Sequence, residues 1–211
     1  MSPPPLRSMA ILLLSGLLLA PLPAVADPGS GFRPIFVGLG FVKAPGIAFD
    51  LVGGFRVLPH LSTLDATPGL GDAARFSLVS NFVTAGLHAV SIATMVRAGT
   101  NRAWDTDQAT LFGCMTNAVA DLGVAVLGLS SGVDLVVRVK AAELTKTDAG
   151  IGASWSGWVN IVMGSLGAVW FVPMVAGGLL GWSEVAQPAM PAVRGPRADQ
   201  GRPSATTLDA G

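Results

Sequence analysis

The sequence lacks the residues on which most enzyme and metal sites depend. It contains no tyrosine, a single cysteine and only two histidines among 211 residues. Cys114 has no partner for an internal disulfide and carries no information on redox compartment. His60 and His88, without a CxxC pair, are too few for a four-ligand zinc site. No Walker loop, GxSxG motif or strand-flanked GxGxxG motif occurs. We therefore expect no enzyme activity, no metal and no cofactor.

Charge is also scarce. Only 12% of the residues are Asp, Glu, Lys or Arg, whereas 51% are hydrophobic, and a soluble domain is about 25% charged. Lipid must therefore cover much of the surface. The formal net charge is zero, which argues against a nucleic-acid partner, since phosphate binding needs concentrated Lys and Arg. Strands of alternating polarity and aromatic girdles, typical of outer-membrane barrels, do not occur either.

Residues 1–26 have the order of parts of a secretory signal peptide. Arg7 precedes an apolar run over residues 9–20, two prolines follow, and Ala24-Val25-Ala26 resembles a small-x-small cleavage site. The apolar run is shorter than the roughly 20 residues that a span needs. We expect cleavage after Ala26. The alternative is an uncleaved first anchor, which would give five spans.

Four apolar stretches follow, each long enough to cross a ~30 Å hydrocarbon core as a helix. They cover residues 35–57, 76–96, 111–133 and 155–182. The sequence thus predicts an all-α integral membrane bundle of about four transmembrane helices within residues 27–182. Residues 58–74 contain prolines, glycines and aspartates and are expected to form a loop. The Pro/Ala/Arg-rich residues 183–211 cannot bury a core and are expected to be disordered.

The expected location is a cell membrane, in particular a bacterial inner membrane, crossed several times. If the signal is used, the mature N-terminus is non-cytoplasmic, and four spans return the C-terminus to the same side. The basic residues of the loops give little further guidance under the positive-inside rule.

A ten-residue pattern recurs once in each stretch. It reads GFVKAPGIAF from Gly40, NFVTAGLHAV from Asn81, NAVADLGVAV from Asn117 and NIVMGSLGAV from Asn160. Position three is always valine and position nine always alanine. This predicts an internal repeat, against the alternative that abundant residues recur by chance.

Positions one, five and nine of the pattern lie four residues apart and so share a helix face. They read Gly40-Ala44-Ala48, Asn81-Ala85-Ala89, Asn117-Asp121-Ala125 and Asn160-Gly164-Ala168. Such small-xxx-small faces let membrane helices approach closely, and asparagines can hydrogen-bond a neighbouring helix. We expect these faces to pack within the bundle or against partner helices.

Two of the stretches also carry a polar seam at helical spacing. The seam of the second consists of Ser77, Asn81, Thr84, His88 and Ser91, and that of the third of Thr110, Cys114, Asn117 and Asp121. Polar seams cannot face lipid cheaply. These two helices are therefore expected to face each other.

Three ionisable residues, Lys43, His88 and Asp121, lie near the middle of their stretches. An acid inside a membrane span usually faces the bundle interior and marks a pathway or an ion pair. One hypothesis is a proton or ion relay, which Asp50, Asp134 and Arg138 would extend toward one side. The preferred alternative is a buried pair of Asp121 with Lys43 or His88. Haem ligation by His88 with Met115 or Met163 is disfavoured, since methionines in apolar helices usually serve packing.

The preferred function is that of a structural or assembly protein of the membrane. The alternative is a small transporter or channel subunit with a midplane Asp121/His88/Lys43 site, and a membrane enzyme ranks last. The expected partners are membrane lipid and, in addition, copies of the chain or other membrane helices. The candidate intramembrane polar site comprises Lys43, Asn81, His88, Asn117, Asp121 and Asn160.

Overall fold

The structure, a computed structural model, describes the backbone of residues 32–186 and the side chains of residues 34–183. Every regular element in this part is a helix. The elements are α2 (Phe32–Val42), α3 (Ala44–Val57), the 3-10 turn η1 (Leu58–His60), α4 (Leu61–Asp65), α5 (Leu70–Thr100), α6 (Thr106–Ala141), η2 (Leu144–Lys146) and α7 (Asp148–Ala186). Four helical segments are long and apolar enough to cross a membrane: Pro34–Asp65, Leu70–Thr100, Thr106–Ala141 and Asp148–Ser183.

The predicted all-α bundle with about four transmembrane helices is therefore confirmed. The predicted signal peptide, and the predicted disordered tail from residue 187 on, lie outside the described residues and stay predictions. Residues 183–186, where the tail was expected to begin, belong to α7 instead.

The first membrane segment is broken into two helices at Lys43. The turn is held by hydrogen bonds from the Lys43 amide to the Gly40 carbonyl and from the Gly46 amide to the Lys43 carbonyl. Pro45 lies in the first turn of α3, where its missing N–H is tolerated, whereas a proline inside a continuous helix removes a backbone hydrogen bond. The break places Lys43 at the junction of α2 and α3.

The expected loop over residues 58–74 is largely wrong. This region holds η1 and α4, and α5 already begins at Leu70. Leu64 and Leu70 are fully buried, so helical structure here puts their side chains into the bundle core. The chain reverses between α4 and α5 at Gly69, whose φ of 71° is in the left-handed region that favours glycine.

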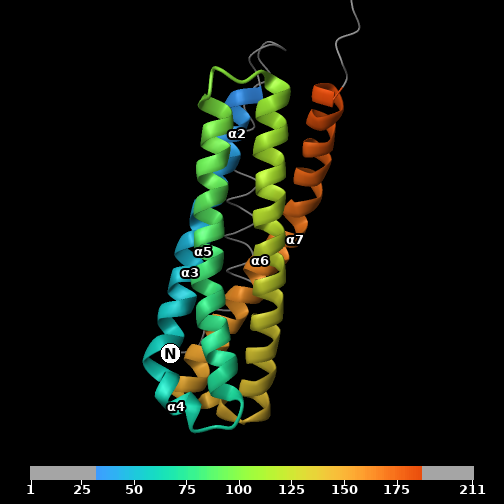
Figure 1. Cartoon of the computed structure of the whole chain (residues 1–211). Helices are drawn as coiled ribbons and strands as arrows, with labels where there is room; N and C mark the ends of the chain where they lie inside the picture. The colour runs from blue at the N-terminus through green and yellow to red at the C-terminus, as the bar shows by residue number, and fades with distance from the viewer. Residues whose placement is uncertain (1–31, 187–211) are drawn as a thin grey trace, which may run out of the picture.

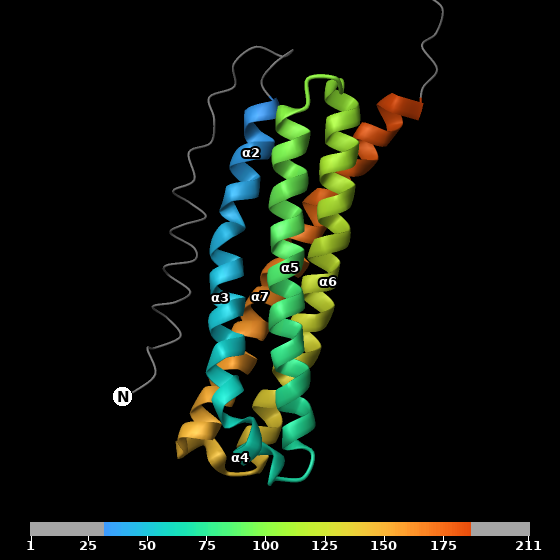
Figure 2. The same ribbon diagram turned by 60° about the vertical axis from the view of Figure 1, so that its left-hand side comes forward.

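The long helices form one elongated bundle. Figure 1 shows α5 and α6 as an antiparallel pair along the full length, with α2 and α3 stacked end to end beside α5. Helix α7 contacts α3 at the lower end and α6 throughout most of its course. Figure 2 shows its C-terminal part leaning away from α2 and α5. The start of α2 and the end of α7 therefore lie at the same end of the bundle.

Glycines permit the close contact of α6 with α7, the most extensive helix interface in the described part. A Cβ atom on Gly128 would lie 2.6 Å from the Asn160 carbonyl oxygen, and one on Gly132 would lie 2.5 Å from the Gly157 carbonyl oxygen. Both neighbours are backbone atoms, which cannot yield as a flexible side chain can. Residues larger than glycine at these two positions would force the helices apart.

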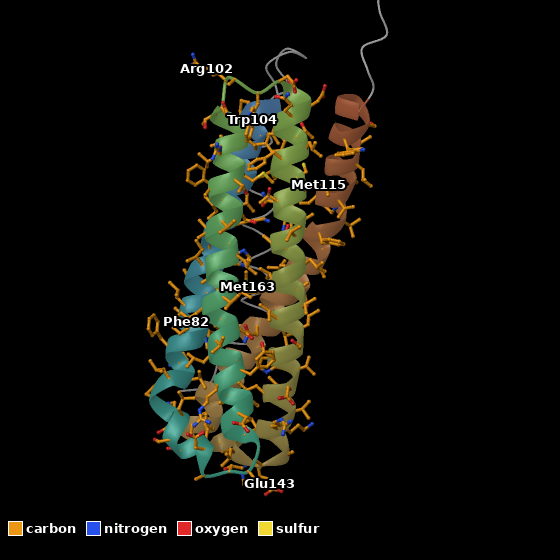
Figure 3. All side chains as sticks on the ribbon, in the orientation of Figure 1. Phe82, Arg102, Trp104, Met115, Glu143 and Met163 are labelled. Atoms are coloured by element: carbon orange, nitrogen blue, oxygen red, sulfur yellow. The ribbon has the colours of Figure 1, made fainter. Side chains whose placement is uncertain are left out.

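Two apolar clusters close the two ends of the bundle. The lower apolar cluster comprises Val57, Leu64, Leu70, Ala73, Ala74, Leu135, Val139, Ala149 and Ala153. The upper apolar cluster comprises Phe36, Met95, Ala98, Ala109, Cys114, Ala118 and Met174. On the outside, large apolar side chains such as Phe82 point away from the bundle (Figure 3). That outer surface suits lipid rather than water.

The predicted small-residue faces are only partly buried. In α6 the face Asn117-Asp121-Ala125 is buried throughout, whereas four alanines of the other faces are exposed: Ala44, Ala48, Ala89 and Ala168. Eight residues of an α-helix turn through about 800°, so the ninth position lies about 80° from the first. Helix α6 buries its whole face because it packs against both α5 and α7. On α7 the small residue that follows Gly164 into the interface is Gly167, not Ala168.

Candidate intramembrane polar site

A buried ion pair joins the first membrane segment to α6. The Lys43 ammonium nitrogen (Nζ) lies 2.6 Å from Oδ1 of Asp121, and the two side chains are only 6% and 2% exposed. The same Nζ donates to Oδ1 of Asn117 at 3.0 Å and to Oγ of Ser91 at 3.2 Å. A lysine ammonium has three hydrogens to donate. All three thus have an acceptor on α5 or α6.

The surroundings of this pair hold it in one geometry. The Asn117 side-chain amide donates to Oγ1 of Thr94 on α5 at 3.2 Å and to the Gly113 carbonyl of its own helix at 2.9 Å. Its carbonyl oxygen is thereby directed to Lys43. Lys43, Ser91, Thr94, Asn117 and Asp121 form the first polar cluster, which links three helical segments.

A second buried pair lies between α3 and α5. His88 Nε2 is 3.6 Å from Oδ2 of Asp50, and the side chains are 6% and 0% exposed. That separation is within ion-pair range but exceeds the length of an N–H···O hydrogen bond. Neither carboxylate oxygen of Asp50 and neither ring nitrogen of His88 has a hydrogen-bond partner among the described residues. This pair is buried but not hydrogen-bonded.

The neighbours of this pair are either small or hydrogen-bonded to other groups. Thr84 lies beside the carboxylate, but the single hydrogen of its hydroxyl is shared between the Ser80 and Asn81 carbonyl oxygens, 2.8 and 3.0 Å away. Gly46 faces the imidazole, and a Cβ atom there would lie 3.0 Å from His88 Nε2. The absence of a side chain at Gly46 lets α3 approach His88 closely.

A third cluster joins α5 to α7. The Asn81 amide donates to Oγ of Ser156 at 2.8 Å, and the Ser156 and Ser77 hydroxyls are 2.9 Å apart. The Asn160 amide donates to Oγ of Ser77, also at 2.8 Å. Gly53 makes room for Asn81, whose Oδ1 would lie 2.6 Å from a Cβ atom on Gly53. The four residues are all fully buried.

The three groups follow one another along the buried face of α5, as the predicted polar seam requires. Ser77 and Asn81 belong to the α7 cluster, His88 to the Asp50 pair, and Ser91 to the Lys43 cluster. All five predicted seam residues of α5 are buried, and α5 packs against α6. The seam does not face α6 alone as predicted, because Ser77 and Asn81 bond α7 and His88 lies beside Asp50 of α3. The seam is bounded on α5 by Ala73 and Ala74 of the lower apolar cluster and by Met95 and Ala98 of the upper one.

The candidate site residues thus fall into separate groups. Lys43, Asn117 and Asp121 meet, as do Asn81 and Asn160 through serines of α5 and α7. Asp121 pairs with Lys43, one of its two predicted partners, while His88 lies beside Asp50 instead.

Asp134 and Arg138 do not extend the seam. They form a pair at 2.8 Å on the surface of α6 and are 42% and 48% exposed. Met163 lies inside the bundle (Figure 3) and, with His88, faces Gly46, whereas Met115 is 40% exposed.

The sequence did not lead us to predict the Asp50–His88 pair or the role of Ser156 in the cluster between α5 and α7. A signal was present for Asp50, which follows Lys43 by seven residues and so shares its helix face. Ser156 lies four residues before Asn160, again on one face.

Comparison of the chain with protein-family models, with curated proteins and with solved structures gave no match.

Proposed function

We propose that the chain is a structural or assembly protein of the membrane, whose helices are held in fixed register by the first polar cluster. The observation that carries this proposal is the Lys43 ammonium with its three acceptors, Ser91, Asn117 and Asp121. An ammonium with every hydrogen bonded and almost no exposure is suited to hold helices together rather than to pass a proton on.

Two further observations support a structural role. Helices α6 and α7 approach so closely that glycines face backbone atoms across the interface, which is typical of permanent membrane helix contacts. The polar seam of α5 is followed by apolar clusters in both directions, whereas a relay needs ionisable groups that reach both surfaces. Membrane lipid and further membrane helices are the partners we propose; nucleic acid is not among them.

A second candidate is a small transporter or channel subunit. The observation in its favour is the number of ionisable groups buried at the centre: Lys43, Asp50, His88 and Asp121. Such residues are costly within a membrane and often mark a pathway. A membrane enzyme comes last, because the sequence carries no catalytic motif.

The decisive experiment replaces the ion pair by apolar residues in one step. The double variant Lys43→Met with Asp121→Leu removes both charges and keeps much of the volume. If the pair is structural, the double variant accumulates in the membrane at a level close to that of the wild type, because apolar replacements of buried pairs are often neutral or stabilising. Cation or proton flux into vesicles containing the purified wild-type protein should equal that of empty vesicles.

The opposite pattern supports the transporter. Flux by the wild-type protein that disappears in a well-folded double variant would overturn the structural proposal. The control is Asp134→Asn, which removes a charge from the exposed part of the same helix and should change neither quantity.

A further inference from the structure

We propose that Asp50 and His88 form a buried proton-binding site that takes up and releases one proton. The four polar atoms of these two side chains all lack hydrogen-bond partners among the described residues, although both residues are buried. Buried polar atoms in native proteins nearly always have a partner. A proton placed between His88 Nε2 and Asp50 Oδ2 would supply the missing hydrogen bond after the two atoms close by a few tenths of an ångström.

The two states of the Asp50–His88 pair differ by a single proton. With the proton bound, the pair is either an imidazolium beside a carboxylate or a neutral imidazole beside a carboxylic acid, and its net charge is zero. Without the proton, a neutral imidazole faces a carboxylate, and the net charge is −1. Because the two groups interact closely, the proton belongs to the pair rather than to one residue.

The histidine differs from one that serves only packing. In a structural or metal-ligating histidine, one ring nitrogen is usually held by a carbonyl or carboxylate that selects the tautomer. Neither nitrogen of His88 is held in this way. A neutral imidazole carries one N–H, which can face Asp50 from Nε2, and the added proton can then bind to the other ring nitrogen or to the carboxylate.

Few other charges act on the pair. On the first membrane segment, Lys43 lies two helical turns before Asp50 and is close enough to act on His88. Arg56 lies six residues after Asp50 and is exposed. On α6 the charge is Asp121, which pairs with Lys43. Residues 149–183 of α7 carry no charged residue, and the other charged residues of α5 lie toward its ends, at Asp72, Arg75 and Arg97. Because Lys43 is paired with Asp121, the buried residues that the structure describes offer no unpaired cation to balance the carboxylate once the proton leaves.

A metal ion suits the Asp50–His88 site less well than a proton does. The described residues include no group of three or more His, Cys, Asp and Glu side chains that could hold one. Asp50 and His88 share no hydrogen bond or ion pair with Lys43 or Asp121 among the described residues, so this proposal and the structural role can fail separately.

The small number of histidines makes a direct test possible. In a His60→Gln variant, His88 is the only imidazole of the chain. We would label histidine with ¹³C, place the variant in lipid nanodiscs, and follow the imidazole signal by NMR as the pH changes. The carboxyl stretch of Asp50 would be followed in parallel by infrared difference spectroscopy, since the proton can rest on either partner.

We expect one protonation step at the pair, seen in the imidazole signal, the carboxyl band or both. Asp50→Asn, which keeps the shape of the side chain, should abolish the carboxyl change and lower the proton affinity of His88 by about tenfold or more, because a carboxylate in contact stabilises the imidazolium. The control, Lys43→Met with Asp121→Asn, should change that affinity by less than about threefold, since it removes a neutral pair.

Three results would overturn the proposal. The first is the absence of any pH-dependent change in both signals. The second is an imidazole transition whose midpoint pH is the same in Asp50→Asn as in the parent protein. The third is a carboxyl change that is still observed in Asp50→Asn. If Asp50→Asn fails to fold, His88→Gln gives the same decision through the infrared band of Asp50, which should then respond at a different pH.

Discussion

The Lys43 ammonium lies 2.6 Å from the Asp121 carboxylate and thereby ties the break between α2 and α3 to the middle of α6. Because both side chains are almost fully buried, neither charge has water as an alternative partner. The stability of the bundle should therefore depend on keeping or removing the two charges together.

The first prediction is that Asp121→Asn destabilises the protein. The amide still accepts a hydrogen bond, but the Lys43 charge is left unpaired, and breaking a buried pair costs about 3 kcal/mol or more. Adding Lys43→Met should restore most of the loss. The free energy of unfolding, measured by denaturant titration in mixed micelles, checks both. Asp134→Asn is the control and should cost less than about 1 kcal/mol, because its pair with Arg138 is exposed.

The second prediction concerns two glycines inside long helices. Gly128→Ala should cost about 1–3 kcal/mol, because its Cβ would lie 2.6 Å from the Asn160 carbonyl oxygen and 2.9 Å from the Gly164 Cα. Gly86→Ala should be neutral or slightly stabilising, because nothing lies within 4 Å of a Cβ there and alanine favours the helix. Equal effects of the two substitutions in the same unfolding assay would contradict the close contact of α6 and α7.

The fold was predictable because the bilayer limits what a long apolar stretch can become. Runs of about 20 apolar residues become helices, since lipid offers no partner for the backbone. The same rule says nothing about residues 58–74, which lie between such runs. Their turn residues suggested a loop, but burial of Leu64 and Leu70 favours helices there.

The site was harder to predict because partners depend on helix rotation. Lys43 and His88 were both possible partners of Asp121, and the choice follows from the helix break at Lys43, which no hydropathy pattern reveals. Residues four apart, as used for the small-residue faces, also do not stay on one side of an α-helix. Over two such steps, or eight residues, their direction rotates by about 80° around the helix axis. The spacing of four therefore predicted Ala168 at the interface where Gly167 lies.

The third prediction tests the cluster between α5 and α7. Ser156→Ala removes the acceptor of the Asn81 amide and the partner of the Ser77 hydroxyl. Since hydrogen bonds between membrane helices average about 0.6 kcal/mol, we expect a loss near 1 kcal/mol in the free energy of unfolding. Ser165→Ala on the same helix is the control. Ser165 is exposed and its hydroxyl donates to the Ile161 carbonyl of its own helix, so its removal should cost almost nothing.

The last prediction concerns the orientation of the bundle. Arg102 and Glu143 lie at opposite ends of the bundle in Figure 3, and the Arg102 end is also where α2 starts and α7 ends. If the N-terminal segment acts as an export signal, the Arg102 end is non-cytoplasmic. The other end, near Arg138 and Lys140, then lies inside, in keeping with the positive-inside rule.

Single cysteines can test this orientation, because Cys114 is the only natural thiol and Cys114→Ala removes it. In that background, Arg102→Cys should react with a membrane-impermeant maleimide on intact cells. Glu143→Cys should react only after the membrane is opened. The reverse pattern would invert the predicted orientation, and labelling of both positions on intact cells would show that the helices between them do not cross the membrane as proposed. In the unsubstituted chain, Cys114, 7% exposed in the upper apolar cluster, should stay unlabelled until the protein is denatured, which provides a control that a buried thiol does not react with the maleimide.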